Sequence, residues 1–408
     1  MRKEALEIVN AAIKAADPYE NTKRLISELF TDERLCVIAV GKAAVPMMRA
    51  AEEVLGDRII NGLLVTKYRH TEGYIPKYCT VIEAGHPVSD ENSILAAEKG
   101  LEIAGELREK DILLVLLSGG GSALFEKSRV PSEIQQDITK RLLGAGASIG
   151  EINAVRKRLS LVKGGLLAAK AFPARVITVA LSDVLSNDPS VIASGITERD
   201  SADDAFVRST VRKYLPELED ELQDILYNKD EIKINDGGYY FAGDINILCD
   251  AAGKRASELG FSVIHRERDL SGEAREEAVR LIDSVPSSKG RCCYIFGGET
   301  VVTISGSGKG GRNQEMALSA AIKLQGKKGI AFISCGSDGT DGPTEDAGGF
   351  ADGGSFLRMI EKGIDPVREL ENNNSNYALN MSGDIVTTGC TGTNVNDITL
   401  ILTDDYEN

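Results

Sequence analysis

The sequence has no uninterrupted apolar run of 18 residues, which is the length that a membrane-spanning helix needs. Its first residues, Met-Arg-Lys-Glu-Ala-Leu, also lack the apolar core of a signal peptide. We therefore expect a cytoplasmic protein without a membrane partner. A basic surplus is missing as well: 47 Lys and Arg face 62 Asp and Glu, a formal net charge of −15. Because nucleic-acid phosphates bind to broad basic surfaces, this balance argues against a nucleic-acid partner.

No Cys-x-x-Cys pair occurs, and the seven cysteines lie mostly in apolar, strand-like runs. These features predict reduced, buried thiols and argue against a zinc site. The 408 residues, 42% of them hydrophobic and 27% charged, are enough for two globular domains. We place the boundary near residue 235, which predicts an N-terminal domain of residues 1–235 and a C-terminal domain of residues 236–408.

Short apolar runs alternate with helical patterns through the first half of the chain. This rhythm is typical of an open, Rossmann-like parallel sheet with helices on both faces. The expected strands are 35–40, 62–66, 78–84, 112–117 and 175–181. Ser148 and Glu151 fit a capping box that opens a helix.

Polar or glycine-rich residues mark the ends of four of these strands: Gly41-Lys42, Ala84–Pro87, Ser118–Ser122 and Ser182-Asp183. Ligands bind beyond the carboxyl ends of parallel strands, so we expect these residues to converge. Lys42 is a compact charge that suits phosphate, and the glycine triplet can cradle one. The alternatives are a surface lysine and a simple tight turn, and a lone histidine is more often structural.

The second half predicts strands at 262–265, 292–296, 301–304, 330–334, 384–388 and 397–402. Because the second and third of these follow each other without a helix, we expect a mixed sheet.

The glycine-rich segment 297–315 embeds Lys309 and Arg312 and leads into a helical pattern. A glycine turn that opens a helix exposes backbone N–H groups, which suits an anion such as phosphate. Gly306, Gly308 and Gly311 also satisfy the dinucleotide pattern G-x-G-x-x-G, but the P-loop pattern fails because Gly310 follows Lys309. A hairpin turn with solvated charges is the alternative.

Acidic and basic side chains add candidate contacts. Asp183 at a strand end, or Asp338 in the acidic glycine loop 334–346, could hold Mg²⁺ or accept a hydroxyl proton. Aspartates that cap loops are the alternative. Arg156, on a predicted helix, could grip a carboxylate through its guanidinium fork, against the alternative of a solvated basic face.

Together these segments resemble the glycerate 2-kinase family with a MOFRL-type C-terminal domain, over nearly the whole chain. The motifs that carry the resemblance are Val40–Ala44, Glu83–Val88, Leu117–Ser122, Ile152–Lys157, Val162–Gly165, Leu181–Val184, Gly297–Thr300, Gly310–Glu315, Asp338–Pro343 and Thr391–Asp397. Ile196 and Cys390 stand where the family usually has proline, which affects only loop geometry.

The resemblance implies transfer of the γ-phosphoryl group of ATP to the 2-hydroxyl of D-glycerate, with Mg²⁺ or another divalent metal. It also implies a site in the cleft between two α/β domains. Lys42, Arg312 and Asp183 are the expected catalytic residues, and His86, Arg156 and Asp183 the expected substrate contacts. Asp183 and Asp338 are the expected metal ligands. The expected nucleotide contacts are Ser118, Gly119, Gly120, Gly121, Ser122, Gly297, Glu299, Gly310, Gly311, Asn313, Asp338, Asp341 and Asn394.

Two other functions fit parts of the pattern. The G-x-G-x-x-G spacing suits a nicotinamide-dependent hydroxypyruvate reductase, and a noncatalytic nucleotide-binding sensor would share the loops. We expect a monomer or a homodimer.

Overall fold

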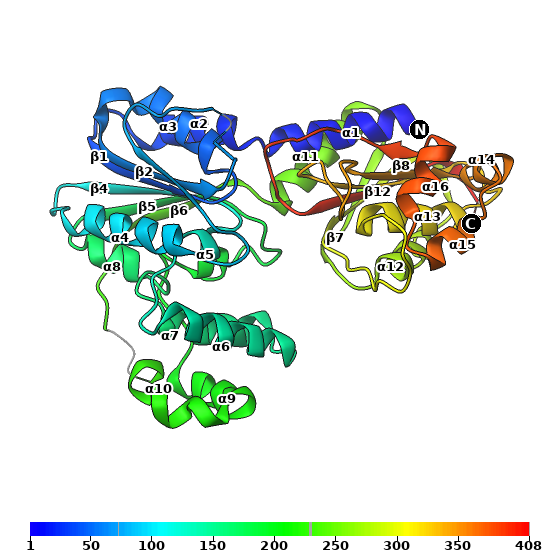
Figure 1. The fold of residues 1–408 in the computed structure, drawn as a ribbon. Helices are drawn as coiled ribbons and strands as arrows, with labels where there is room; N and C mark the ends of the chain where they lie inside the picture. Colours follow the sequence, from blue (N-terminus) through cyan, green and yellow to red (C-terminus); the bar gives the residue numbers. More distant parts are fainter. Residues whose placement is uncertain (72, 228–230, 408) are drawn as a thin grey trace. The chain divides into compact units, whose positions relative to one another are not determined.

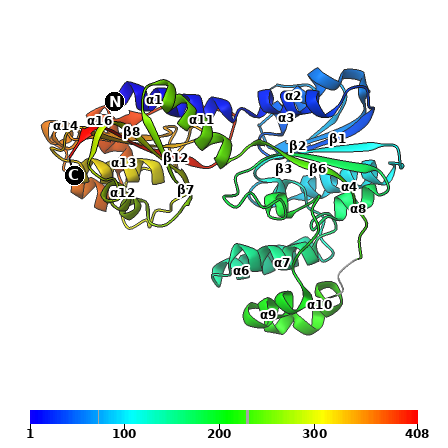
Figure 2. The same ribbon diagram turned by 180° about the vertical axis from the view of Figure 1, so that it is seen from behind.

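Buried strands organise the chain into two sheets in a computed structural model that describes residues 1–71, 73–227 and 231–407. Residues 18–242 form one compact unit, here called the Rossmann-like unit, and residues 1–17 with 243–408 form the other, the mixed-sheet unit. Figures 1 and 2 show the sheet of each unit between its own helices.

This division differs from the predicted boundary at residue 235 in two ways. The strand β6 (Asn235–Gly243) belongs to the first sheet, so that sheet ends later than predicted. The first 17 residues belong to the mixed-sheet unit, because helix α1 (Arg2–Ala15) packs against α11 (Ile245–Glu258). The buried side chains of α1 include Ile8, Val9 and Ile13, so this helix is part of a core.

The described strands of the Rossmann-like unit run in the order β3-β2-β1-β4-β5-β6, and the pairs from β3 through to β5 are parallel. Their bounds are β1 Leu35–Val40, β2 Ile59–Lys67, β3 Thr80–Ala84, β4 Ile112–Leu117 and β5 Arg175–Leu181. Every residue of β1 and β4 is buried, as their continuous apolar sequences predict. The strand order reverses between β1 and β4, and doubly wound sheets bind ligands at such a reversal.

Helices cover both faces of this sheet (Figures 1 and 2). Helices α2 (Pro18–Leu29) and α3 (Ala44–Leu55) lie on one face, and α4 (Glu91–Gly105), α5 (Gly121–Leu124) and α8 (Leu166–Ala171) on the other. Three short 3₁₀ turns occur in the described part of this unit: η1 (Gly56–Arg58), η2 (Ile192–Ser194) and η3 (Pro216–Leu218).

Four further helices form a lobe with its own apolar core. They are α6 (Ser132–Gly144), α7 (Ile149–Leu159), α9 (Asp204–Tyr214) and α10 (Glu219–Leu226), and Leu142, Val155 and Val211 are among their buried side chains. The predicted capping box opens α7: the Ser148 hydroxyl accepts the Glu151 N–H, and the Glu151 carboxylate accepts the Ser148 N–H.

The mixed-sheet unit has the strand order β11-β10-β9-β12-β8-β7, in which β7 and β8 are parallel and the other pairs antiparallel. The strands are β7 Ser262–Leu270, β8 Ser288–Gly298, β9 Ile330–Gly336, β10 Gly348–Asp352, β11 Ile385–Val386 and β12 Asp397–Tyr406. Helices α1 and α11 cover one face (Figure 1). The other face carries α12 Ala274–Asp283 and α13 Arg312–Lys323, with α14 Ser355–Glu361, α15 Pro366–Glu371 and α16 Ser375–Ser382 packed nearby.

The prediction of a mixed sheet is confirmed, but its stated reason is wrong. Residues 301–304 form no strand, and Val301 and Ile304 are exposed. Of the apolar side chains in this segment, only Val302 packs against the core, so the β-branched pattern alone does not make a strand. The antiparallel pairs are β8–β12, β12–β9, β9–β10 and β10–β11. Of these strands β10 is not predicted, because its glycines Gly348 and Gly349 interrupt the apolar pattern.

Candidate functional site

At the strand-order reversal of the Rossmann-like sheet, the residues that follow β1 are hydrogen-bonded to those that follow β4. The Lys42 N–H donates to the Gly119 carbonyl at 2.9 Å, and the Ala43 N–H donates to Ser118 Oγ at 3.0 Å. Gly41 has a φ of +131°, and a Cβ there would lie 2.5 Å from the Ser118 carbonyl oxygen. Gly41 is therefore required for the two strand ends to approach this closely.

The glycine loop after β4 presents backbone donors without protein acceptors. The N–H groups of Gly119, Gly120 and Ser122 donate to no residue that the structure describes, whereas the Gly121 N–H reaches the Ser118 carbonyl. Gly120 has a φ of +88°, which turns the loop back towards β1. Successive unpaired N–H groups in a turn form a cradle for an anion.

Lys42, His86 and Asp183 surround this glycine loop. A Cβ on Gly120 would lie 3.0 Å from His86 Cδ2 and 3.5 Å from Lys42 Cγ, and one on Gly119 would lie 2.2 Å from Asp183 Oδ2. The predicted convergence of four strand ends is therefore what the structure contains. We call Lys42, His86, Ser118–Ser122 and Asp183 the strand-end cluster.

Charge in the strand-end cluster favours an anion. The half-buried Lys42 ammonium makes no hydrogen bond or ion pair with any described residue. Burial, and then the charges of Lys42 and Lys67, lower the pKa of His86, so the imidazole is neutral near pH 7. A neutral imidazole beside an ammonium can accept or donate a hydrogen bond without cancelling the positive field.

A chain of polar contacts joins the glycine loop to α7. Ser122 Oγ lies 2.8 Å from Ser194 Oγ, which donates to Asn153 Oδ1 at 3.3 Å. Ser194 has a φ of +55°, a strained value for a serine. Arg156 follows Asn153 by three residues on α7, so both lie on the same side of the helix.

Arg156 has the environment expected of a ligand-binding arginine. Its side chain is half-buried and makes no hydrogen bond or ion pair with a residue in the described part of the chain. Burial lowers the pKa of Arg156, and the nearby Glu126 carboxylate opposes that effect. Its neighbour Arg158, in contrast, is fully engaged by Asp200, Asp204 and two carbonyl oxygens.

The second glycine loop, between β8 and α13, does not offer the donors that its sequence suggests. Asparagine side chains and one carbonyl from 372–374 accept the N–H groups of Ser305, Gly306, Ser307, Gly308 and Lys309. A Cβ on Gly306 or Gly308 would lie within 2.3–2.4 Å of residues 372 and 374. The glycines thus allow the backbone to pack on 372–374, and the expected anion cradle is wrong for residues 305–309.

At the start of α13 the acceptor of the backbone N–H groups is a protein side chain. The buried Asp341 carboxylate accepts the N–H groups of Asn313 at 3.2 Å and Gln314 at 2.8 Å. Asn313 is itself buried and accepts from Ser334 Oγ at 2.6 Å. Asp341 and Asn313, both expected to bind nucleotide, therefore have structural partners that occupy their polar atoms.

Arg312 is held in place by two carboxylates. Asp397, the first residue of β12, accepts from Arg312 Nε at 2.5 Å and Nη2 at 3.0 Å, and Glu299 Oε1 lies 3.1 Å from Nη1. We call Arg312, Glu299 and Asp397 the arginine cluster. Burial alone would lower the pKa of Arg312, but Asp397 and Glu299 raise it, so the guanidinium stays charged. In the sequence Asp397 is predicted only as the last residue of the motif Thr391–Asp397. No nearby residue indicates its ion pair with Arg312.

The other expected nucleotide contacts of the mixed-sheet unit are either glycines packed against neighbouring residues or side chains that accept a backbone N–H group. Gly297 packs on α11, where a Cβ would lie 2.6 Å from Ile245, and Gly310 and Gly311 pack similarly on Ser375 and Asp341. Asp338 Oδ1 accepts the N–H of Thr340 at 2.9 Å, and Asn394 Oδ1 accepts the N–H of Asn396 at 3.4 Å.

No group of three or more His, Cys, Asp or Glu side chains that could hold a metal occurs in the described ranges. Asp183 and Asp338 each offer a single carboxylate, and Mg²⁺ is a cation that takes one or two carboxylates and completes its shell with phosphate oxygens and water. Within the same ranges, no helix is both long and apolar enough to cross a membrane.

Comparisons with known proteins agree with this arrangement. Residues 4–227 match the model of a domain of unknown function (DUF4147), and residues 292–397 match the MOFRL family. The D-glycerate 2-kinase of Thermotoga maritima is 44% identical over 98% of both chains. The chain belongs to the glycerate 2-kinase family.

Other relatives fit this family. The crystal structure of the Thermotoga maritima glycerate kinase superposes with a TM-score of 0.93 over 98% of this chain and 99% of that one. The glycerate 2-kinase of Pyrococcus horikoshii is 39% identical over 98% of this chain and 97% of its own. A putative hydroxypyruvate reductase of Agrobacterium vitis is 35% identical over 97% of this chain and 93% of its own. The two α/β units match the expected fold class.

Proposed function

We propose that this protein transfers the γ-phosphoryl group of ATP to the 2-hydroxyl of D-glycerate, giving 2-phosphoglycerate and ADP. The observation that carries the proposal is the strand-end cluster, in which an unpaired lysine and three unpaired backbone N–H groups meet at the reversal of a Rossmann-order sheet. Phosphoryl transfer needs such prearranged donors because its catalysis rests on positioning and electrostatics. The substrate and the choice of the 2-hydroxyl rest on the names of the relatives.

We assign roles to the residues of both units by their chemistry. Lys42 and the N–H groups of Gly119 and Gly120 stabilise negative charge on the transferring phosphoryl group. Asp183 accepts the proton of the attacking hydroxyl, and Arg156 binds the carboxylate of glycerate through its guanidinium fork. Arg312, kept charged by Asp397, stabilises phosphate charge in the same reaction.

A divalent cation is part of the proposal. Mg²⁺ neutralises phosphate charge when it is bound with ATP, and Asp183 or Asp338 would be its carboxylate ligand. Asp183→Asn and Asp338→Asn, each assayed over a range of Mg²⁺ concentrations, separate the candidates, because loss of a ligand raises the Mg²⁺ requirement.

The proposal is tested by ADP formation with ATP, Mg²⁺ and D-glycerate. We expect Lys42→Ala to lower kcat by about 10²–10³, equivalent to roughly 3–4 kcal/mol, because one donor to the developing charge is removed. Lys110→Ala is the matched control, since Lys110 is exposed and has no hydrogen bond or ion pair with the described residues. A Lys42→Ala enzyme within about threefold of the wild type would remove Lys42 from this role.

The reductase alternative loses its structural basis. The N–H groups of Gly306 and Gly308 bond to residues 372–373, and the G-x-G-x-x-G segment lies outside the Rossmann-order sheet. We therefore expect no quenching of NADH fluorescence on titration with the protein. Saturable quenching would revive that function, and ATP binding without turnover would favour the sensor.

A further inference from the structure

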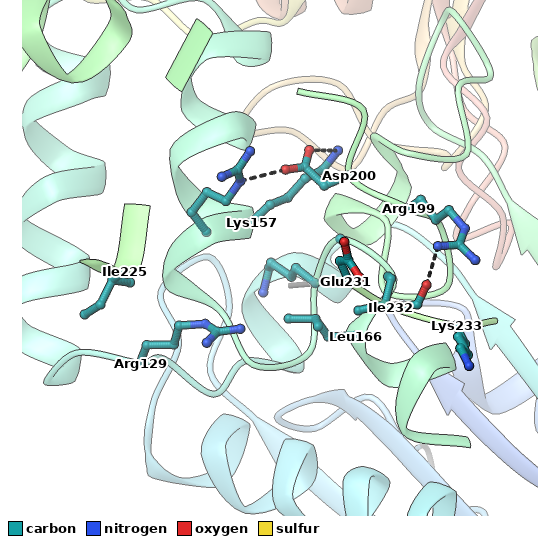
Figure 3. Close-up of a pocket in the computed structure, with 12 residues that line it drawn as sticks. Arg129, Lys157, Leu166, Arg199, Asp200, Ile225, Glu231, Ile232 and Lys233 are labelled. Atoms are coloured by element: carbon teal, nitrogen blue, oxygen red, sulfur yellow. Dashed lines mark hydrogen bonds and ion pairs between the residues drawn. The ribbon is translucent and has the colours of Figure 1, made fainter. Parts of the chain in front are cut away.

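A cavity of about 660 Å³ lies in the Rossmann-like unit, between α7, α10 and the segment that precedes β6. None of the residues expected at the kinase site lines it. Figure 3 shows Arg129 reaching into it from one side, with Glu231 and Ile232 opposite. The lining residues are Arg129, Lys157, Arg158, Lys163, Gly164, Leu166, Arg199, Asp200, Ile225, Glu231, Ile232 and Lys233.

The cavity is basic in a strongly acidic protein. Six of the lining side chains are cationic and two are carboxylates, whereas the whole chain has a formal net charge of −15. Walls of low dielectric focus such a local charge and concentrate anions.

The three most buried cations of the cavity form ion pairs with carboxylates of the protein. Lys163 is wholly buried and pairs with Glu126, Lys157 lies 3.8 Å from Asp200, and Arg158 bonds to Asp200 and Asp204. These pairs fix the wall of the cavity and leave it close to neutral.

The exposed lining residues Arg199 and Lys233, here called the rim, supply the positive charge that a ligand would meet. Arg199 is exposed and donates from Nη1 to the Ile232 carbonyl at 2.6 Å, which holds the guanidinium at the cavity, as Figure 3 shows. Its Nε and Nη2 atoms donate to no described residue. Lys233 is also exposed, and its ammonium lies 6.0 Å from the Phe172 ring without an ion pair in the described ranges. Two cations thus stand at the rim with free donors.

The chemistry of the lining selects one class of ligand. A guanidinium fork and an ammonium together suit the two charges of a phosphate better than the single charge of a carboxylate. Leu166, Ile225 and Ile232 add apolar surface beside these cations, which suits a carbon body attached to the anion.

We propose that this cavity is a second anion site, which binds a small phosphate ester with its phosphate at Arg199 and Lys233. The site is separate from the strand-end cluster, although the segment 192–200 contacts both: Ser194 reaches Ser122, and Arg199 lines the cavity. Binding there does not depend on the proposed kinase reaction.

Calorimetric titration of the intact protein with phenyl phosphate at low ionic strength tests this site. Binding should be saturable, and the double variant Arg199→Gln, Lys233→Gln should bind at least about tenfold more weakly. The double variant Arg34→Gln, Lys110→Gln removes the same charges from exposed positions and should bind like the wild type. Benzoate should bind more weakly than phenyl phosphate.

The Lys42→Ala variant separates this site from the kinase site. It should bind phenyl phosphate as the wild type does, whether or not the protein is a kinase. Loss of binding in Lys42→Ala, with binding retained in the Arg199→Gln, Lys233→Gln variant, would overturn the proposal. So would equal affinity for benzoate, or no saturable binding up to about 10 mM phenyl phosphate.

Discussion

At the residue scale, the position of Arg312 depends on the carboxylate of Asp397. Two hydrogen bonds from Arg312 to Asp397 fix the plane of the guanidinium, and Glu299 contacts the remaining nitrogen. A guanidinium held in this way is prearranged for phosphate, because one N–H group on each Nη atom remains and little conformational entropy is left to be lost on binding.

The change Asp397→Asn tests this dependence. It keeps the shape but loses the charge and one acceptor, so we expect kcat to fall by about 10–100-fold, as for other residues that orient a catalytic group. The KM for D-glycerate should stay within about twofold. Glu299→Gln, which alters the more exposed of the two carboxylates, should lower kcat less than Asp397→Asn does. Equal effects of the two changes would contradict the assigned role of Asp397.

Asp341 gives a prediction for stability against pH. Burial raises its pKa from the usual range to about 7. Between about pH 4 and 7 the folded state therefore holds a proton that the unfolded state has lost, so the free energy of unfolding should fall as the pH rises, by at most about 1.4 kcal/mol per pH unit.

Asp341→Asn should remove that slope while lowering stability overall, because an amide satisfies the N–H groups of α13 less well. Denaturant unfolding at pH 4, 5.5 and 7 measures both effects. An unchanged slope in the variant would show that Asp341 is not the titrating group.

The residue scale also marks a limit of the sequence. Lys42 and Ser118–Ser122 could be assigned to one edge because parallel strands place their ends together. The pairing of Arg312 with Asp397 could not, since 85 residues separate the two. The sequence predicts Asp341 as a nucleotide contact, whereas the structure shows it capping α13. A carboxylate that caps a helix and one that binds a ligand look alike in sequence.

At the element scale, two glycine-rich loops with similar sequences have opposite uses. The loop after β4 keeps three N–H groups unpaired, whereas the loop before α13 gives the N–H groups of residues 305–309 to residues 372–374. The N–H groups of Asn313 and Gln314, in the first turn of α13, donate to Asp341. Local sequence suggests donors in both, but only the tertiary partners decide whether those donors remain available.

The change Gly119→Ala tests the loop after β4. Its Cβ would lie 2.2 Å from Asp183 Oδ2, so the loop or Asp183 must shift, and we expect kcat to fall by at least about tenfold. Gly144→Ala in α6 meets no atom within 4 Å and should leave activity unchanged, with a gain in stability of up to about 1 kcal/mol. Wild-type activity in Gly119→Ala would mean that the geometry of this loop is not needed.

At the scale of the whole molecule, the mixed-sheet unit is built from both ends of the chain. Arg2 bonds to the buried Asp384 at 3.1 Å, and Thr393 Oγ1 donates to the Ala16 carbonyl at 2.8 Å. The alternation of strands and helices identified both α/β units, but no pattern within residues 1–17 could reveal which unit they join.

Fragments test this organisation. A fragment of residues 243–408 should fold poorly alone, because Ile8, Val9 and Ile13 of α1 are missing from its core. Adding a peptide of residues 1–17 should raise its melting temperature in a concentration-dependent way, as expected for a bound partner. A fragment that melts like the intact protein without the peptide would contradict the division.

The central claim concerns the reaction, and phosphorus NMR of the product from ATP, Mg²⁺ and D-glycerate tests it most directly. Our account predicts the signals of 2-phosphoglycerate and ADP. A 3-phosphoglycerate signal would keep the kinase but contradict the choice of hydroxyl, and the absence of any phosphorylated product, with ATP binding demonstrated, would contradict the claim itself.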